Sequence, residues 1–446
     1  MAKLTCFGGA GSATGANFFL ELENARILVD CGMEQGLNAF KHNNRQFPYE
    51  PSSMEYLFVT HAHIDHVGLI PKLVKAGFKG EIYSTPETKA LGELLMLDAS
   101  RIGIHDDAVL YTPDDVAASL KLWHTLPYHT PKAFDGFSVE LFDAGHVLGS
   151  SLIKFTFPSG KTMLFTGDIG NSPSPLLKDV EKVSGLDYLL TESVYGDRQH
   201  EDRENRDAKF LEIAKAAIAR GGTLLIPAFS LERTQMLLEK LDNLLESKTL
   251  PSVPVYLDSP LAIRLTGIYE KVRHLYNARI EGELGRGDDI FSFKELKETL
   301  RGADSHQIDR TNGPKIIIAG SGMSTAGRIL GHEARYLPDT QSTLLLTGYQ
   351  AIGTLGRQLE EGMKRVRIDG QDVSVRAKIE KIEGYSGHAD SDALVEFASA
   401  SAKTLRKVFV GMGELKSEIF LAQRLHDELG LDAVALEEGR SYDVDI

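Results

Sequence analysis

Short apolar runs, each followed at once by small or polar residues, dominate the pattern of this chain. The run Tyr56-Leu57-Phe58-Val59 is the clearest, and similar runs occupy 26–31, 81–84 and 138–142. Such runs are typical of buried strands, whereas segment 86–99 has the spacing of an amphipathic helix. This alternation predicts an α/β fold up to about residue 200.

The pattern changes after residue 200, where charged amphipathic helices alternate with apolar strands. This alternation is typical of a parallel, doubly wound domain. The last part of the chain predicts a strand, a helix over 415–429 and a final strand. Residues 100–135 and 279–313 are less regular, and we expect the latter to interrupt the second domain.

Length and composition narrow the class of protein. The 446 residues, 42% of them hydrophobic, are enough for two domains with large cores. The two cysteines and the lack of a leader or long apolar span predict a soluble cytoplasmic protein without disulfides or a membrane partner. The formal charge of −14 argues against a surface that binds polyanions everywhere, but it allows a local basic groove.

Four potential metal ligands stand close together directly after the strand that ends at Val59. His61 and His63 alternate along the chain and can converge on one ion, while Asp65 and His66 are offset toward a second. Imidazole and carboxylate suit zinc or another borderline divalent ion, and paired ions can clamp both the attacking and the leaving oxygen of a phosphodiester. The alternative is a histidine-rich surface loop, which the apolar runs on both sides of the cluster disfavour.

Five further residues follow predicted strands in the same way: Asp30, His146, Asp168, Glu192 and His388. Asp168 is placed to bridge two ions, and Asp30 to accept a hydrogen bond from a ligating histidine, unless it is a turn residue. His388 is expected to be the last ligand. The repeated placement at strand ends is the strongest indication from the residues that they share one site.

Two glycine-rich loops are candidate phosphate sites. The loop Gly8–Gly15 lacks the spacing of a nucleotide-binding motif, so a tight turn is the better interpretation. The loop that holds Ser321, Gly322 and Met323 precedes a helix, and a phosphate site and a simple turn remain open there. The candidate substrate contacts are those three residues with Arg233, Arg328 and Arg357, any of which can instead be structural.

The order of these residues resembles a known signature. Asp30, His61-x-His63-x-Asp65-His66, His146 and Asp168 resemble the metallo-β-lactamase fold, an αββα sandwich with a dinuclear zinc site. Thr191-Glu192-Ser193, a long α/β insertion and Ser386-Gly387-His388-Ala389-Asp390 are similar to the β-CASP branch, which contains RNA-processing nucleases. The resemblance implies a metallo-β-lactamase domain over 1–197 and 356–446, with an inserted parallel α/β β-CASP domain over 198–355.

The resemblance also implies roles for the site residues. Two zinc ions per chain are expected: the first on His61, His63 and His146, the second on Asp65, His66 and His388, with Asp168 bridging and Asp30 behind them. Asp65 and Glu192 are expected to act in catalysis, Glu192 by organising proton transfer. Gln358 aligns with a proton-donating histidine of the eukaryotic endonuclease subunit and cannot replace it, so His332 or water would protonate the leaving oxygen.

The expected activity is zinc-dependent hydrolysis of single-stranded RNA, as an endonuclease, a 5′-exonuclease or both, in RNA processing or decay. The N-terminal RNA-binding extension of many archaeal members is not expected here, because the catalytic fold is expected to begin at Leu4. RNA binding would then depend on the two domains or on a second subunit of a homodimer. A thioester or lactone hydrolase would explain the acidic charge and the ligands but not the insertion. A non-catalytic scaffold is disfavoured because every expected ligand is present.

Overall fold

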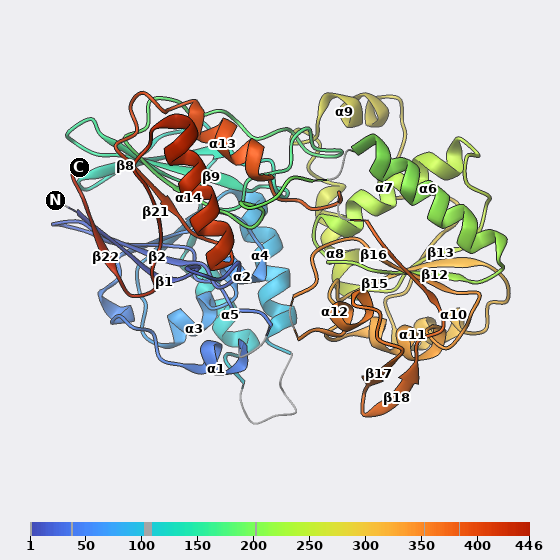
Figure 1. Ribbon diagram of the computed structural model, residues 1–446. Helices are drawn as coiled ribbons and strands as arrows, with labels where there is room; N and C mark the ends of the chain where they lie inside the picture. Colours follow the sequence, from blue (N-terminus) through green and yellow to red (C-terminus); the bar gives the residue numbers. More distant parts are fainter. Residues whose placement is uncertain (1, 37–38, 102–108, 201–202, 352, 383) are drawn as a thin grey trace. The chain divides into compact units, whose positions relative to one another are not determined.

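The chain divides into two units, whose elements are labelled in Figure 1. The computed structural model describes residues 2–36, 39–101, 109–200, 203–351, 353–382 and 384–446. Unit 1 comprises Met1–Gln199 with Gly387–Ile446, and unit 2 comprises His200–Ser386. The first boundary lies next to the expected one at 197, but the second lies later than the expected 355. The chain stays in unit 2 because the strand at 378–381 pairs with the sheet of that unit.

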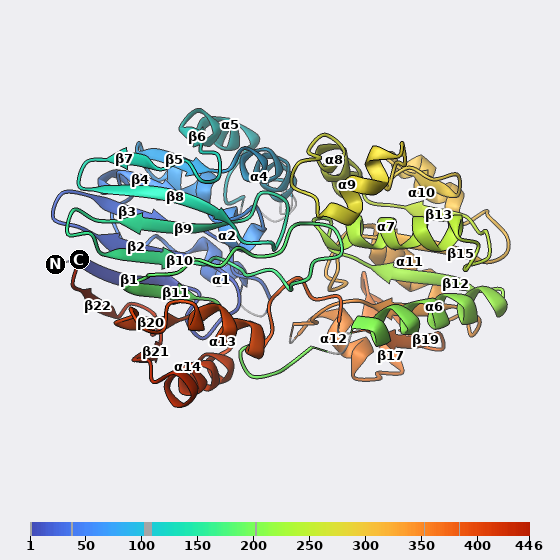
Figure 2. The same ribbon diagram turned by 90° about the horizontal axis from the view of Figure 1, so that it is seen from above.

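Unit 1 is built on two sheets of seven strands each. The first sheet has the order β22 (Ser441–Val444), β1 (Ala2–Gly8), β2 (Asn17–Glu21), β3 (Arg26–Val29), β4 (Tyr56–Phe58), β5 (Glu81–Ser84) and β6 (Trp123–Thr125). The second has the order β21 (Ala433–Ala435), β20 (Lys407–Val410), β11 (Tyr188–Thr191), β10 (Thr162–Phe165), β9 (Ser151–Thr156), β8 (Phe137–Asp143) and β7 (Lys132–Phe134). Figure 2 looks onto the stacked sheets.

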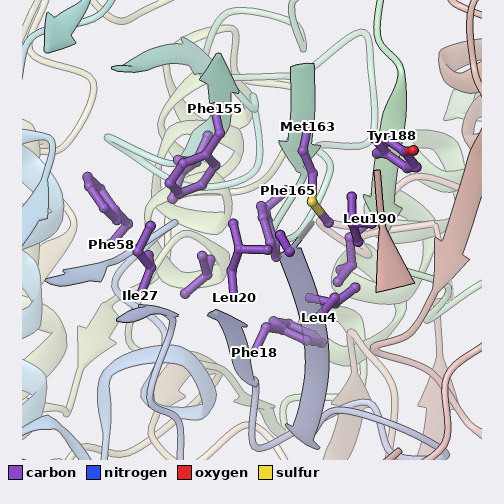
Figure 3. Close-up of a cluster of buried hydrophobic side chains, with 14 of the residues drawn as sticks. Leu4, Phe18, Leu20, Ile27, Phe58, Phe155, Met163, Phe165, Tyr188 and Leu190 are labelled. Atoms are coloured by element: carbon purple, nitrogen blue, oxygen red, sulfur yellow. The ribbon is translucent and has the colours of Figure 1, made fainter. Parts of the chain in front are cut away.

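The period of two along the strands decides which side chains fill the space between the sheets. In β10 and β11, Phe165 and Leu190 face the first sheet, while their neighbours Leu164 and Leu189 join the cluster on the outer face. Figure 3 shows the inner cluster, in which Phe58 meets Phe155 edge to face at 5.3 Å between ring centroids. The two sheets therefore share one apolar core.

Helices cover the outer face of each sheet. The first sheet packs against the group α2 (Ile64–Val67), α3 (Ile70–Lys75), α4 (Pro86–Ala99) and α5 (Pro113–Lys121), with α1 (Ala39–Asn44) on the same side. The second sheet packs against α13 (Ser391–Ser399) and α14 (Leu415–Leu429). This is the expected αββα sandwich. Among the helices that the structure describes, none combines the length and the apolar character needed to cross a bilayer.

Unit 2 is the expected parallel α/β domain. Its sheet has the order β14 (Leu296–Glu298), β13 (Val255–Leu257), β15 (Lys315–Ala319), β12 (Thr223–Pro227), β16 (Thr343–Leu346) and β19 (Lys378–Lys381), and all its neighbouring strands are parallel. Its remaining elements are α6 (Arg203–Ala219), α7 (Arg233–Glu246), α8 (Pro260–Tyr269), α9 (Ala278–Gly285), α10 (Gly302–Ile308), α11 (Arg328–Tyr336), α12 (Leu355–Glu360) and the hairpin of β17 (Arg365–Ile368) and β18 (Gln371–Ser374). The segment 279–313 is therefore more regular than expected, since it holds α9, β14 and α10.

The glycine-rich loop after β1 is a tight turn held by a buried carboxyl group. Glu418 of α14 is fully buried, and its Oε1 accepts a hydrogen bond from the backbone N–H of Gly11 at 2.8 Å. Burial raises the pKa of Glu418 from its usual 4.5 to about 8, against the opposing effect of the N–H groups of Gly11 and Gly413. The interpretation as a turn is favoured over a phosphate site.

We expect Glu418→Gln to change how stability depends on pH. The folded state holds the Glu418 proton more tightly than the unfolded state, so this stabilisation is complete below the unfolded pKa of 4.5 and is lost as pH rises to about 8. Glu418→Gln has no carboxyl group to titrate at this position, so its stability does not fall in this way as pH rises. Urea unfolding across that pH range should show the free energy of unfolding of the variant gaining on that of the wild type, and parallel curves would contradict the assignment.

Candidate metal centre

The candidate ligands of unit 1 gather where strands of both sheets end. Asp30 follows β3 and His61 follows β4, and these two strands are parallel neighbours in the first sheet. In the second sheet, β8 and β10 are both antiparallel to β9, so they run the same way and end at the same edge. His146 follows β8 and Asp168 follows β10. The topology thus explains why these distant positions meet.

Three histidines and one carboxylate form a compact cluster. His63 Nδ1 lies 3.1 Å from His61 Nε2 and 3.2 Å from His146 Nε2. Asp168 Oδ2 lies 3.4 Å from His61 Nε2 and 3.6 Å from His146 Nε2. Ligands about 2.0–2.1 Å from one zinc ion in a tetrahedron lie about 3.3 Å apart. The four side chains therefore fit a single zinc ion.

Hydrogen bonds behind the rings select the tautomers that such an ion needs. His146 Nδ1 donates to the carbonyl oxygen of Gly387 at 3.0 Å, which leaves Nε2 to face the cluster. His61 Nδ1 lies 3.1 Å from Thr60 Oγ1, which in turn donates to Asp30 Oδ2 at 2.8 Å. The rings are thus oriented by groups outside the cluster.

Asp30 is the main anchor of this outer layer. Its Oδ1 accepts the backbone N–H of Thr60 at 2.8 Å, and its Oδ2 accepts Nδ1 of His66 at 2.8 Å. Asp30 itself has a φ of 59°, a conformation unusual for a residue other than glycine. The structure therefore places Asp30 behind His66.

Asp168 lies between the three-histidine cluster and His66. Its Oδ1 is 3.5 Å from His66 Nε2, and both of these buried atoms have no hydrogen-bond partner among the described residues. Burial alone would raise the pKa of Asp168, but His66 and His61 hold it well below its usual range. A buried carboxylate that faces two groups of imidazoles is suited to bridging two ions.

Burial keeps the imidazoles of His63 and His146 neutral. Burial and the neighbouring histidines lower the pKa of His63 and His146 well below 6.5. A metal ion binds the neutral imidazole, so these rings need lose no proton to bind one at neutral pH.

The second predicted ligand set is only partly assembled. Among the described residues, the second group with ligand atoms within 4.8 Å of one another is Asp168, Glu192 and His388, and it does not include Asp65. His388 Nδ1 lies 3.2 Å from Glu192 Oε2. Burial lowers the pKa of His388, but Glu192 and Asp168 outweigh it and raise the pKa to about 9. Asp65 is half-buried in the first turn of α2 and interacts electrostatically with His66, Asp168 and His61, but its carboxylate does not join that group at ligand spacing.

The other candidates lie in unit 2, where several have structural partners. Asp258 accepts hydrogen bonds from His332 Nε2 at 2.7 Å and Arg328 Nη1 at 2.6 Å. It also accepts from the hydroxyls of Thr299 and Ser305. Although burial raises the pKa of Asp258, these donors hold it well below its usual range. Arg328 and His332 are thus committed to a buried network.

The remaining unit 2 candidates lie in a tightly packed loop and on two helices. Ser321 Oγ lies 2.8 Å from Thr325 Oγ1, and the carbonyl of Met323 accepts from Gly356 N–H at 3.2 Å. Gly322 packs so closely on Phe229 that a Cβ would lie 2.8 Å from the Phe229 nitrogen. Arg233 is buried, and Arg357 donates to Glu361 at 2.7 Å on the surface of α12. The loop geometry accounts for the glycine without a phosphate.

Two contributors to the centre were missed in the sequence. The carbonyl of Gly387 orients His146, and a backbone acceptor leaves no signal in side-chain identity. Ser150 Oγ accepts the backbone N–H of His146 at 3.0 Å. A serine directly after Gly149 in a stretch of buried residues was a weak clue to this role.

A buried histidine and carboxylate cluster at the open edge of a two-sheet sandwich defines a metal centre of the metallo-β-lactamase type. Family profiles agree: "Metallo-beta-lactamase superfamily" matches residues 14–228, "Beta-Casp domain" matches 234–359, and "Zn-dependent metallo-hydrolase RNA specificity domain" matches 372–436. The chain belongs to the β-CASP branch of the metallo-β-lactamase superfamily.

Curated relatives support this placement along the whole chain. Ribonuclease TTHA0252 of Thermus thermophilus is 33% identical over 403 residues, which cover 90% of this chain and 92% of the relative. The transcription termination factor FttA of Methanosarcina mazei is 30% identical over 457 residues, covering 97% of this chain and 70% of the relative. A crystal structure of an Enterococcus faecalis V583 protein of unknown function shares the fold, with a TM-score of 0.57, 12% identity and 99% of each chain covered.

Proposed function

We propose that this protein is a zinc-dependent ribonuclease that hydrolyses phosphodiester bonds of single-stranded RNA in the cytoplasm. The observation that carries the proposal is the convergence of His61, His63, His146 and Asp168 at zinc-ligand spacing. The ribonuclease of Thermus thermophilus, which matches nearly the whole chain, and the matched RNA specificity domain point to RNA as the substrate.

The proposed site binds two zinc ions per chain. His61, His63 and His146 would hold the first, and His66 with Asp65 and His388 the second, with Asp168 between them. Zinc, when bound, activates water at neutral pH and stabilises negative charge as a Lewis acid. The 3.5 Å approach of His66 Nε2 to Asp168 Oδ1 supports the shared carboxylate. Asp65, which interacts electrostatically with His66 and Asp168, would complete the second set.

Glu192 is proposed to organise proton transfer by fixing His388. Its carboxylate accepts the backbone N–H of Ile169 at 2.6 Å and lies 3.2 Å from His388 Nδ1. Because Ile169 directly follows Asp168, this bond ties the bridging carboxylate to the same group. The bond from His332 Nε2 to Asp258 favours water over His332 as the source of the leaving-group proton.

A cleavage assay tests the proposal. Zinc-loaded protein would be incubated with 5′-labelled single-stranded RNA, an RNA duplex of the same sequence, a thioester and a lactone. We expect zinc-dependent cleavage of the single strand, with internal fragments if the enzyme is an endonuclease and a labelled mononucleotide if it is a 5′-exonuclease. Turnover of the thioester or lactone with intact RNA would establish the alternative, a small-molecule hydrolase.

Phosphate contacts are proposed for Arg233 and Arg357 and for the loop from Ser321 to Met323. Arg328 is a weaker candidate because its guanidinium already donates hydrogen bonds to Asp258 and to the carbonyls of Thr299 and Leu300. A homodimer remains part of the proposal, as a second source of RNA contacts.

A further inference from the structure

A group of acidic side chains lies in unit 2 and shares no residue with the proposed zinc centre. Asp242 and Glu246 stand one turn apart on the same face of α7, and Asp288 comes from the segment after α9. One carboxylate oxygen of each lies within 4.8 Å of one of each of the others. Three carboxylates drawn from two elements therefore converge on one point.

The burial of Asp242 makes this arrangement unusual. Its side chain is 3% exposed, and it makes no hydrogen bond or ion pair with any residue that the structure describes. A buried carboxylate without a partner is costly unless a cation or a donor compensates it. Asp242 points into the acidic group, so a cation bound there would compensate its charge.

The surrounding negative charges increase the free-energy cost of ionising Asp242. Burial, followed by the charges of Glu246, Asp288, Glu239 and Asp289, raises the pKa of Asp242 to about 7. The last turn of α7 holds no basic residue, so the negative end of the helix dipole adds to the same field.

Two basic side chains of this region pair with other carboxylates. Arg279 pairs with Glu239 at 2.7 Å and with Glu283 at 2.9 Å. Lys240, on α7, pairs with Asp207 at 2.6 Å. Neither of these pairs includes Asp242, and Glu246 is exposed, so an ion with part of its water shell can enter.

We propose that Asp242, Glu246 and Asp288 form a binding site for one hard divalent cation, Ca²⁺, Mg²⁺ or Mn²⁺. All three ligands are carboxylates, which suit hard cations, and the absence of histidine or cysteine from the group disfavours zinc. The bound ion links the end of α7 to the segment that follows α9. It stabilises unit 2 and takes no part in hydrolysis.

Titration calorimetry on the zinc-loaded full chain, in buffer stripped of other divalent ions, tests the site. CaCl₂, MgCl₂ and MnCl₂ would be added to the wild type, to Asp242→Asn and to Glu246→Gln. The matched control is Asp372→Asn, which removes an exposed carboxylate from β18. We expect the wild type and the control to bind one ion that Asp242→Asn does not bind, and Glu246→Gln to bind it at least about tenfold more weakly.

Thermal unfolding gives a readout that is independent of activity. A saturating cation should raise the Tm of the wild type by about 2–4 °C and leave that of Asp242→Asn unchanged. In cation-free buffer Asp242→Asn should melt above the wild type, because it lacks the uncompensated buried charge. Equal binding by the wild type and Asp242→Asn, an equal loss in Asp372→Asn, or no binding at millimolar cation would overturn the site.

Discussion

Asp168→Asn is expected to lower RNA cleavage by about a thousandfold or more. Asp168 faces His61 and His146 through one carboxylate oxygen and His66 through the other. The amide of asparagine replaces one of these oxygens with an NH₂ donor. It therefore cannot present an oxygen both to His61 and His146 and to His66. Single-turnover cleavage of labelled RNA at saturating enzyme, beside zinc content by mass spectrometry, measures the loss.

The matched control is Asp114→Asn, which makes the same chemical change at an exposed position of α5 in the same unit. It should cleave RNA at the wild-type rate and retain its zinc. Wild-type cleavage by Asp168→Asn with full zinc content would show that the bridging carboxylate is not needed.

Asp30→Asn is expected to reduce metal affinity or activity by about 10–100-fold, although Asp30 touches no metal. One oxygen of Asp30 accepts from both Thr60 Oγ1 and His66 Nδ1, and the other accepts from the Thr60 backbone. An asparagine can keep only one of these oxygens, so a buried donor loses its acceptor. Unfolding should also become easier, by about 1–3 kcal/mol.

Substitutions of Thr60 separate orientation from packing. Thr60→Ser keeps the hydroxyl that links His61 to Asp30 and should stay near wild-type activity. Thr60→Val keeps the shape, loses the hydroxyl and should show a zinc dependence shifted in the same direction as Asp30→Asn. Equal behaviour of the serine and valine variants would mean that the hydroxyl does not orient the ring.

The helices with strong local signals could be predicted with their bounds. Helix α4 begins where Thr85 caps the chain and Pro86 occupies its first turn, and α14 ends at Gly430, whose φ of 68° suits glycine. Helix α5 was missed, although Thr112 and Asp115 form a capping box that the sequence displays. Its short amphipathic pattern lay within an otherwise irregular stretch.

Long-range pairing explains what could not be predicted. The second domain boundary lies later than expected because β19 pairs with β16 of unit 2. No local signal in 356–386 indicates that the strand at 378–381 pairs with β16. The repeated placement of candidate ligands at strand ends predicted that they lie together, because neighbouring strands of each sheet end at the same edge. The placement at strand ends could not show that Glu192 rather than Asp65 would join His388 at ligand spacing. Nor could it show that Asp258 would accept hydrogen bonds from His332 and Arg328. Those choices depend on side-chain rotamers and on packing between segments.

Anomalous diffraction at the zinc edge, from crystals of the zinc-loaded wild type, tests the central claim most directly. We predict one peak within about 2.1 Å of His61 Nε2, His63 Nδ1 and His146 Nε2, and a second on the other side of Asp168, next to His66 Nε2. A map with no peak among these three histidines, in protein that holds stoichiometric zinc, would contradict the metal centre and the ribonuclease proposal with it.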